Sequence, residues 1–558
     1  MGFDNIKYSK EENTLTRKYL LPTRIIKSEN VKDDANLLLD SPRQPTFGRH
    51  NLTVLHTGGW VLLDFGSEIQ GGIDIVIHSI TQKRPRVRIV FGESVMEALS
   101  EVGGDKNPTN DHSVRDFTAE VTGLSAARFG NTGFRFVKVQ SLDCDLYIKG
   151  IKAVFEYKDV PYLGSFRCDD ELLNNIWDTA AYTVHLNMLD YLIEGTKRDR
   201  LVWLGDLHPE VSTIMSVFGY DESVPKTLDL IRDDTPLDVP EDPEHPENMW
   251  MNHIPSYTFW WIKIHRDWFW QNGDLEYLTE QKDYMYKAIN LIFSKLDSNG
   301  KMDVHSYFID WSSNNTENME AGFKGCLIIA LRAAADIFEI YGDSSMSQKC
   351  LDAIPVVAKD PCCYEGNKQT AAIVSLADMA DCKYISDNII KKDLLSGLST
   401  FYGFYVLHAL AKTGDTAAAL DIIRNYWGAM LKLGATTFWE DFDIDWLENA
   451  APIDEIVPEG KIDVHGDYGK FCYTNFRHSL SHGWASGPAP FMSEHILGIK
   501  VVEPGCSKIK IEPHLGNLKW AKGTYPTPYG ILTVEHKYEN GKITTHIDAP
   551  EGVEITEG

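Results

Sequence analysis

The spacing of the apolar residues changes twice along the chain, and these changes restrict the possible fold more than any other feature. Apolar and polar residues alternate in four segments of the first third, at 60–66, 73–78, 86–91 and 134–139. Between about residues 168 and 498 the apolar residues recur at helical spacing, as at 172–184, 327–340 and 405–411. The alternation returns near the end, at 507–512, 530–535 and 542–547. Alternation is typical of half-buried strands, and the longer spacing is typical of amphipathic helices.

These patterns predict three domains. A chain of 558 residues exceeds what one hydrophobic core usually organises. We expect an N-terminal β-sandwich domain at 1–160, an all-helical domain at 161–498 and a smaller C-terminal β-sandwich domain at 499–558. The helical domain lacks the strand–helix alternation of an α/β fold, which favours paired helices arranged in a ring. The aromatic run 259–270 covers all faces of one helix and is expected to be buried.

Composition and charge exclude several classes of partner. The formal net charge is −27 at neutral pH, which disfavours nucleic acid and anionic membrane surfaces because both attract clustered lysine and arginine. The sequence contains no run of 18 apolar residues, so no membrane-spanning helix is expected. A carbohydrate substrate fits better, since 14 Trp, 24 Tyr and 24 Phe residues can offer flat apolar faces to sugar rings. The oligomeric state stays open.

Neither a metal site nor an export signal is predicted. The nine cysteines include no C-x-x-C pair, and the sequence contains no His-Glu-x-x-His or EF-hand pattern, so no metal or cofactor is expected. The first residues contain neither a cationic nor an apolar segment, which predicts a cytoplasmic protein for the sequence as it stands. If a signal peptide had been removed, the protein would instead be periplasmic or secreted.

The charged segment 194–206 carries the strongest indication of chemistry. It contains three carboxylates, three cations and an indole: Glu194, Asp199, Asp206, Lys197, Arg198, Arg200 and Trp203. If these groups line one cavity, the pKa values of the carboxyls must be pushed apart, as acid and base catalysis requires. The alternative is a solvated loop with surface ion pairs. Trp203 favours the cavity, because a sugar-binding pocket uses the flat apolar face of an indole.

The same segment resembles the signature of the inverting α-L-rhamnosidases of glycoside hydrolase family 78, Arg-x-Glu-Arg-Leu-Gly-Trp-x-Gly-Asp. The matching residues are Arg198, Arg200, Leu201, Trp203, Gly205 and Asp206. Two positions depart, because Asp199 replaces the family's general-acid Glu and Val202 replaces a Gly. The resemblance implies that Asp199 is the general acid, with a carboxyl set back by roughly 1.5 Å relative to Glu. It also implies an (α/α)₆ barrel for the helical domain.

Two further segments extend the resemblance. Residues 434–443 are similar to the family's Gly-Ala-Thr-Thr-x-Trp-Glu, which carries the general-base role over to Glu440; the alternative is an ion-paired surface glutamate. Residues 479–487 are similar to Ser-x-Asn-His-x-x-x-Gly, which makes His482 a sugar-binding histidine; the alternative is a satisfied structural one. The expected substrate-binding residues are Glu194, Arg198, Trp203, Asp206, Trp250, Asp310, Trp311, Trp439 and His482.

The resemblance predicts an exo-acting glycoside hydrolase that removes terminal α-L-rhamnose from oligosaccharides, polysaccharides or glycosides with inversion. Asp199 would protonate the leaving oxygen and Glu440 would activate water. Two alternatives stay open. A polysaccharide lyase on the same barrel would cleave a rhamnosyl-glucuronate linkage by β-elimination, with base and cation drawn from Lys197, Arg198, His253 and His482. A non-catalytic sugar-binding protein would bind without turnover.

Overall fold

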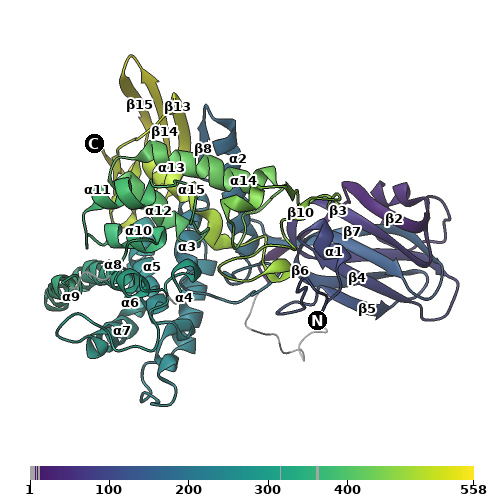
Figure 1. Cartoon of the computed structure of the whole chain (residues 1–558), viewed down its shortest axis with the longest axis horizontal. Helices are drawn as coiled ribbons and strands as arrows, with labels where there is room; N and C mark the ends of the chain where they lie inside the picture. The colour runs from purple at the N-terminus through teal and green to yellow at the C-terminus, as the bar shows by residue number, and fades with distance from the viewer. Residues whose placement is uncertain (1–6, 8, 10–12, 315, 360–362, 558) are drawn as a thin grey trace.

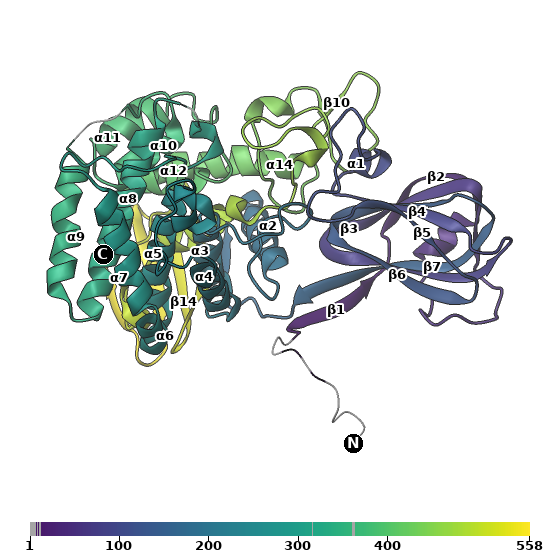
Figure 2. The same ribbon diagram turned by 90° about the horizontal axis from the view of Figure 1, so that it is seen from below.

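The computed structural model describes residue 7, residue 9 and residues 13–314, 316–359 and 363–557. Residues 1–6, on which the prediction about export rested, lie outside this part of the chain. Figure 1 shows an elongated molecule with the N-terminal strands at one end and the helices at the other. The C-terminal strands lie against the helices, as Figure 2 also shows. Among the described residues, no helix combines the length and the apolar character needed to cross a lipid bilayer.

The N-terminal region is an antiparallel sheet that encloses its own core. The strand order is β1-β7-β3-β6-β4-β5, and β2 pairs with β3. The strands are β1 (Leu15–Leu20), β2 (Arg24–Lys32), β3 (Thr53–Ile80), β4 (Arg86–Gly92), β5 (Asp116–Glu120), β6 (Ser125–Ser141) and β7 (Leu146–Lys158), and helix α1 (Val95–Leu99) follows β4. The two segments expected as separate strands at 60–66 and 73–78 are parts of β3, which shifts register twice along β6. Such shifts bend a strand, and Ile75, Phe91 and Phe134 meet in a common core.

The central part of the chain is helical. Its helices are α2 (Glu171–Asn187), α3 (Leu207–Val217), α4 (Ser223–Asp234), α5 (Pro255–Asn272), α6 (Leu275–Glu280), α7 (Lys282–Lys295), α8 (Met319–Ile340), α9 (Ser344–Val357), α10 (Lys368–Leu376), α11 (Cys382–Ile385), α12 (Gly403–Lys412), α13 (Thr416–Ile422), α14 (Gly428–Lys432) and α15 (Pro488–Phe491). Local sequence fixes several ends. The Asp170 carboxylate caps α2 by accepting from the N–H groups of Leu172 and Leu173. Gly273 ends α5 in the left-handed conformation, at a φ of 72°.

Short helical turns connect these helices and the flanking strands. They are η1 (Asp34–Leu38), η2 (Pro246–Met249), η3 (Met251–His253), η4 (Trp311–Ser313), η5 (Ser386–Ile390), η6 (Ile423–Trp427), η7 (Ile444–Leu447), η8 (Asn475–Arg477), η9 (Gly483–Ser486), η10 (Met492–Ile496) and η11 (Pro504–Cys506). Helix α5 packs against α3 and α8. Its aromatic run is buried, with 0 to 1% exposure at Phe259, Trp260, Trp261 and Trp268. The all-round apolar pattern had predicted this burial.

The C-terminal region contains two small sheets, with the orders β15-β14-β13-β8 and β11-β12-β16. The strands are β8 (Ser165–Cys168), β11 (Ile499–Glu503), β12 (Lys508–Ile511), β13 (Trp520–Thr527), β14 (Gly530–Glu539), β15 (Lys542–Asp548) and β16 (Glu554–Glu557). Strand β8 precedes the helices in sequence, yet it pairs with β13, with Cys168 opposite Ala521. The C-terminal sheet therefore borrows a strand from the range that the sequence assigned to the helical domain.

The N-terminal sheet and the helical region meet through a long loop segment. The two-residue strands β9 (Ala450–Ala451) and β10 (Ile462–Asp463) pair in parallel within it. The Val95 N–H donates to the Ile453 carbonyl oxygen over 2.9 Å, and Ser94 Oγ lies 2.8 Å from His465 Nδ1. Both views show this segment beside α1 (Figures 1 and 2). The candidate site lies where the helical region, this loop segment and the N-terminal sheet come together.

Candidate active site

A tight loop presents the charged residues that follow α2. Glu194 and Leu201 form an isolated antiparallel bridge, in which the Glu194 N–H donates to the Leu201 carbonyl oxygen over 2.8 Å. The enclosed turn has positive φ values at Asp199 (65°) and Arg200 (52°), and aspartate tolerates this conformation better than most residues. Glu194 and Arg198 expose 0% and 1% of their surface. The solvated-loop alternative does not fit these buried charges, although Leu201 at the far side of the turn is 48% exposed.

The Arg198 guanidinium lies between the two predicted catalytic carboxyls. Its terminal nitrogens donate hydrogen bonds to Asp199 Oδ1 and to Glu440 Oε1. Its Nε donates to the Arg477 carbonyl oxygen over 2.9 Å, and the guanidinium stacks on the Tyr473 ring at 3.9 Å from the centroid. Arg198 thus binds both predicted catalytic carboxyls with one rigid cation and brings them together in one site.

The two carboxyls are driven towards opposite protonation states. Burial raises the pKa of Asp199, an effect that the Arg198 charge offsets only in part and the Glu440 charge reinforces. Burial opposes ionisation of Glu440 as well, but the Arg198 charge outweighs it and holds the pKa of Glu440 well below its usual value. The Ser479 N–H also donates to Glu440 Oε2 over 2.9 Å. Glu440 is therefore an ionised base, whereas Asp199 keeps its proton to higher pH than an ordinary aspartate.

Both backbone polar groups of Glu440 are held by hydrogen bonds. Its N–H donates to the Ser479 carbonyl oxygen over 3.0 Å. Its carbonyl oxygen accepts from Thr400 Oγ1 over 2.6 Å and from Trp484 Nε1 over 3.0 Å. The Cys472 thiol lies 2.9 Å from Glu440 Oε1, and burial followed by the Glu440 charge raises the pKa of this thiol well above its usual value. The thiol therefore stays protonated and donates to the carboxylate; no motif in the sequence pointed to Cys472.

A second acidic cluster surrounds His482. Its Nε2 lies 3.4 Å from Glu194 Oε1 and 4.0 Å from Asp206 Oδ2, and Glu194 Oε1 also accepts from the Gly483 N–H. Burial and the neighbouring carboxyls raise the pKa values of Glu194 and Asp206 well above their usual range, and burial lowers the pKa of His482 to about 3. The two carboxyls therefore keep their protons to higher pH than ordinary carboxyls, and the imidazole is neutral near neutral pH. Neutral carboxyl and imidazole groups can each donate to and accept from hydroxyl groups.

Glu210 on α3 completes this cluster and was not predicted from the sequence. Burial raises the pKa of Glu210 to about 7, and its Oε1 accepts from Asn187 Nδ2 over 2.9 Å. A Cβ atom at Gly483 would lie 1.5 Å from this Oε1, so the carboxyl fits only because residue 483 is glycine. Glu210 follows Asp206 by four residues. Residues four apart lie on one face of a helix, so this spacing could have indicated from the sequence that Glu210 lies near Asp206.

The predicted aromatic residues take up two kinds of position. Trp203 contacts Tyr257 edge-on at 6.5 Å, and the Tyr257 hydroxyl donates to Asp206 Oδ1 over 2.7 Å. A Cβ atom at Gly205 would lie 2.2 Å from the Tyr257 ring, so glycine permits this packing. Trp311 exposes 36% of its surface and lies 6.3 Å from Tyr473, the ring beneath Arg198. Both Trp203 and Trp311 are thus joined to the carboxyl clusters through one tyrosine each.

Three predicted residues lie in the surrounding helical core. Asp310 accepts from Ser312 and from Ser399 Oγ, the latter over 2.9 Å, and burial raises the pKa of Asp310 to about 6. Trp250 and Trp439 belong to the hydrophobic core of the helical region, where they contact Phe259 and Phe442 edge-on. Their role in contacting a ligand stays a prediction.

The N-terminal sheet anchors the loop through Lys197. Its ammonium lies 2.9 Å from Glu93 Oε2 and 3.1 Å from Glu97 Oε1. It also donates to the carbonyl oxygens of Phe476 and His478 over 3.0 and 2.8 Å. Because these four partners surround the ammonium in the interior, Lys197 is a structural cation and is not free to neutralise a substrate carboxylate.

Backbone groups of the same loop are tied to the N-terminal sheet as well. The Gly133 N–H donates to the Thr196 carbonyl oxygen over 2.8 Å. Arg200 donates to Gln70 Oε1 over 2.8 Å, and His112 Nδ1 donates to the Asp199 carbonyl oxygen over the same distance. The N-terminal sheet therefore determines the position of the loop that carries Asp199.

Two groups of potential metal ligands lie in this region. Glu194, Asp206 and His482 form one, and Glu93, Glu97 and His465 form the other; within each, the ligand atoms lie within 4.8 Å of one another. The first is poorly suited to a cation because burial makes its carboxyls harder to ionise. In the second, Glu93 and Glu97 already pair with the Lys197 ammonium. Neither group therefore favours a metal ion.

Glycoside hydrolysis uses a pair of carboxyl groups, and this site brings such a pair together. Residues 161–330 match the family model described as bacterial alpha-L-rhamnosidase 6 hairpin glycosidase domain, and residues 498–556 match the bacterial alpha-L-rhamnosidase C-terminal domain. These two segments of the chain are thus similar to domains of bacterial α-L-rhamnosidases. The resemblance to family 78 that the motifs carried is confirmed.

Individual relatives agree with these matches. A curated α-L-rhamnosidase of Formosa agariphila is 26% identical over 160 residues, which are 27% of this chain and 16% of that protein. A family 78 rhamnosidase of Bacillus sp. GL1 has a TM-score of 0.73 at 22% identity, covering 94% of this chain and 55% of that chain. A Klebsiella oxytoca rhamnosidase with rhamnose bound has a TM-score of 0.67 at 20% identity, covering 86% and 96%. The two structures show the multidomain fold, and the chain spans only part of the Formosa and Bacillus proteins.

Proposed function

We propose that this chain is an exo-acting α-L-rhamnosidase that removes terminal α-L-rhamnose from oligosaccharides, polysaccharides or glycosides with inversion. The proposal is carried by the opposite pKa shifts of Asp199 and Glu440 on either side of Arg198. Inverting hydrolysis needs one carboxyl that holds a proton and one that is ionised, on opposite faces of the sugar. The likeness to rhamnosidases supports the choice of sugar.

In the proposed reaction, Asp199 donates its proton to the glycosidic oxygen as the bond from that oxygen to the anomeric carbon breaks. A water molecule attacks the anomeric carbon from the opposite face, and Glu440 accepts a proton from it. The configuration therefore inverts, and the leaving alcohol and rhamnose are both neutral. Asp199 ends ionised and Glu440 protonated, so exchange with solvent restores the starting state. Arg198 fixes the positions of both carboxyls throughout.

The cluster around His482 supplies the sugar contacts in this proposal. In their neutral forms, which burial favours, Glu194, Asp206 and His482 can each donate to one hydroxyl and accept from another. Trp203 covers the 6-methyl group of rhamnose with its indole face. A sugar with a 6-hydroxyl would lose this apolar contact and would bury a hydroxyl against the ring.

The domain architecture is part of the same proposal. We propose that residues 161–498 form an (α/α)₆ barrel and that residues 1–160 and 499–558 form β-sandwich domains, with β8 completing the last. The structural likeness to rhamnosidases supports this arrangement. The enclosed core of the N-terminal sheet supports a sandwich at that end.

The comparisons and the contacts do not favour the lyase alternative. Elimination needs a cation that neutralises the carboxylate of the substrate, but Lys197 is engaged by Glu93 and Glu97. The test is to follow an aryl α-L-rhamnoside and a panel of rhamnosylated oligosaccharides by NMR and by absorbance. We expect free β-L-rhamnose as the first product. Release of the α anomer would contradict inversion, an absorbing unsaturated uronate would indicate elimination, and binding without product would indicate a sugar-binding protein.

A further inference from the structure

A cavity of about 540 Å³ lies within the helical region, away from Asp199 and Glu440. Residues of α5, α8, α12, η10 and β11 line it, and the predicted catalytic and substrate-binding residues do not. Its wall includes both cationic and anionic side chains, among them Lys263 and Asp267. The proposed hydrolysis makes no use of this cavity.

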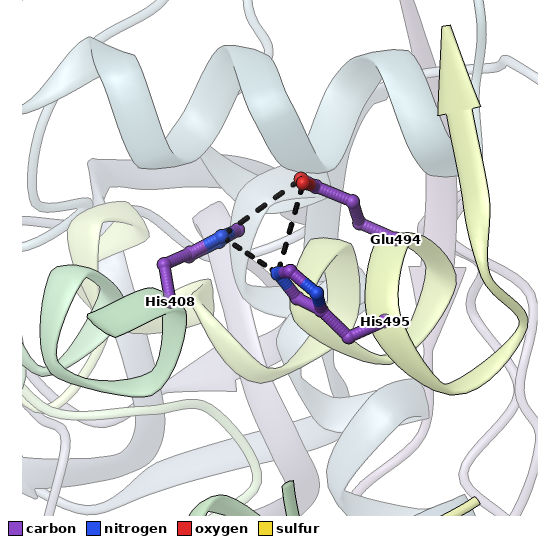
Figure 3. A group of neighbouring side chains, drawn as sticks. All are labelled: His408, Glu494 and His495. Carbon is purple, nitrogen blue, oxygen red and sulfur yellow. Dashed lines mark hydrogen bonds and ion pairs between the residues drawn. The ribbon is translucent and has the colours of Figure 1, made fainter. Parts of the chain in front are cut away.

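His408 and Glu494 line this cavity, and they and the adjacent His495 point towards one another, as Figure 3 shows. His408 belongs to α12, and Glu494 and His495 belong to η10. His495 Nε2 lies 3.0 Å from His408 Nδ1. The Glu494 carboxylate lies 3.6 Å from His495 Nε2 and 3.9 Å from His408 Nδ1. Two separate segments of the chain therefore converge on one point with two imidazole nitrogens and a carboxylate.

We propose that His408, Glu494 and His495 bind a divalent transition-metal ion, with Zn²⁺ as the representative. Donor atoms that each lie about 2.0–2.2 Å from one ion are separated by about 3 to 4 Å. All three separations in the cluster fall in this range. Imidazole nitrogen with carboxylate oxygen is a donor set that suits Zn²⁺ and its neighbours, whereas Ca²⁺ and Mg²⁺ prefer oxygen alone.

A simple hydrogen bond between the two rings accounts for only one of these distances. The 3.0 Å separation of the ring nitrogens suits an N–H donor and a nitrogen acceptor. The carboxylate distances of 3.6 and 3.9 Å exceed the hydrogen-bond range. Glu494 is therefore placed as a third ligand would be, and not as an acceptor for either ring.

The charges around the cluster leave its carboxylate open to a bound cation. The neighbouring lysines already have carboxylate partners, because Lys263 pairs with Asp267 and Lys500 lies 2.9 Å from Glu512. A bound cation would therefore balance the Glu494 carboxylate, and the cavity leaves room for water at the remaining coordination positions.

The site connects α12 to η10, the turn that immediately precedes β11. An ion bound there would cross-link two segments that are far apart in sequence. Because the unfolded chain does not hold the three ligands together, binding to the folded state would raise the melting temperature. This gives a readout that is independent of glycoside hydrolysis.

The test uses the full chain after treatment with a chelator, titrated with Zn²⁺ by calorimetry and followed by thermal melting. We expect one strong site per chain with micromolar or tighter affinity, a higher melting temperature and no response to Mg²⁺. His408→Gln and Glu494→Gln should each weaken binding by at least about tenfold, since even loss of an outer partner of a ligand has that effect. The glutamine of His408→Gln keeps an amide that can contact His495. The melting temperature of this variant without metal shows whether it still folds as the unaltered chain does. His546→Gln, at an exposed position on β15, is the matched control and should bind as the unaltered chain does.

Two results would overturn the proposal. One is that the unaltered chain does not bind zinc at submillimolar concentrations, or that both variants bind it as tightly as the unaltered chain does. The other is a Co²⁺ spectrum with thiolate-to-metal charge-transfer bands, because this would locate the ion at a cysteine such as the exposed Cys363. A Co²⁺ spectrum without these bands that disappears in His408→Gln and Glu494→Gln would support the site.

Discussion

The cluster of Glu194, Asp206 and His482 and the cluster of His408, Glu494 and His495 combine carboxyl and imidazole groups, but their carboxyl pKa values are shifted in opposite directions. In the first, burial raises the pKa values of both carboxyls, so they keep their protons to higher pH than ordinary carboxyls. In the second, burial again opposes ionisation, but the neighbouring histidines and lysines outweigh it and lower the pKa of Glu494. The surrounding groups therefore decide whether a carboxyl in such a cluster favours its neutral form or its anion. The first cluster suits a hydroxylated sugar, and the second suits a cation.

If hydrolysis takes place at the buried carboxyl site, Glu440→Gln should have the largest effect on activity. We expect turnover to fall by about 10³-fold or more on both aryl rhamnosides and natural linkages, because water still needs a base whatever the leaving group. Steady-state rates on the two substrates measure this. Glu503→Gln, at an exposed position on β11, is the control and should stay within about twofold of the unaltered chain. Full activity in Glu440→Gln would remove the base assignment.

The next largest effect distinguishes the acid role of Asp199 from the base role of Glu440. Asp199→Asn should lower turnover on natural linkages by about 10²- to 10³-fold but on aryl rhamnosides by less than about tenfold. The reason is that an aryl leaving group departs with little protonation. The ratio of the two rates is the measurement, and equal losses on both substrates would contradict the acid role.

A smaller effect tests the departure of Asp199 from the family's glutamate. Asp199→Glu should raise turnover on natural linkages by up to about tenfold, because the added CH₂ restores the reach of the carboxyl. The Asp199 side chain is 13% exposed, so the longer chain can extend without overpacking and the melting temperature should change by no more than about 2 °C. A drop in both turnover and melting temperature would instead indicate a pocket closed around the shorter side chain. No change in either would place Asp199 outside the site.

The smallest expected effect tests whether burial sets carboxyl charge in the helical region. Burial raises the pKa of Asp310 from 3.8 to about 6, so the folded state favours the protonated form. The stability from this carboxyl is present below about pH 4 and is lost as the pH rises through about 6. Asparagine cannot ionise, so the melting temperature of Asp310→Asn minus that of the unaltered chain should become more positive across this window and then level off. Asp242→Asn, at an exposed position, supplies the baseline; a constant difference for Asp310→Asn would refute the shift.

Much of the fold and part of the site could be predicted from local pattern. Strands and helices followed from residue spacing, although one strand, β3, replaced two expected ones because the register shifts inside it are not visible as turn signals. The motif residues Asp199 and Glu440 meet at Arg198, which spacing alone does not predict. It was the family resemblance that paired these two distant carboxyls as acid and base.

Other parts of the site depend on contacts that no local pattern specifies. Glu93 and Glu97 lie about 100 residues before Lys197, in a region where the sequence predicted no site residue. Cys472 belongs to no motif, and its contact with Glu440 arises only in the folded chain. Such partners are set by the way the N-terminal sheet packs on the loop, which is a property of the tertiary structure.

The pairing of β8 with β13 has a consequence for how the protein is made. Strand β8 leaves the ribosome about 350 residues before its partner, an interval of about 20 to 70 s at ordinary rates of translation. During that time the helices that follow β8 can pack while its edge has no partner, and an unpaired edge invites association with other chains. We therefore expect production of the protein in cells to depend on chaperones or on slow expression until the last 60 or so residues have emerged.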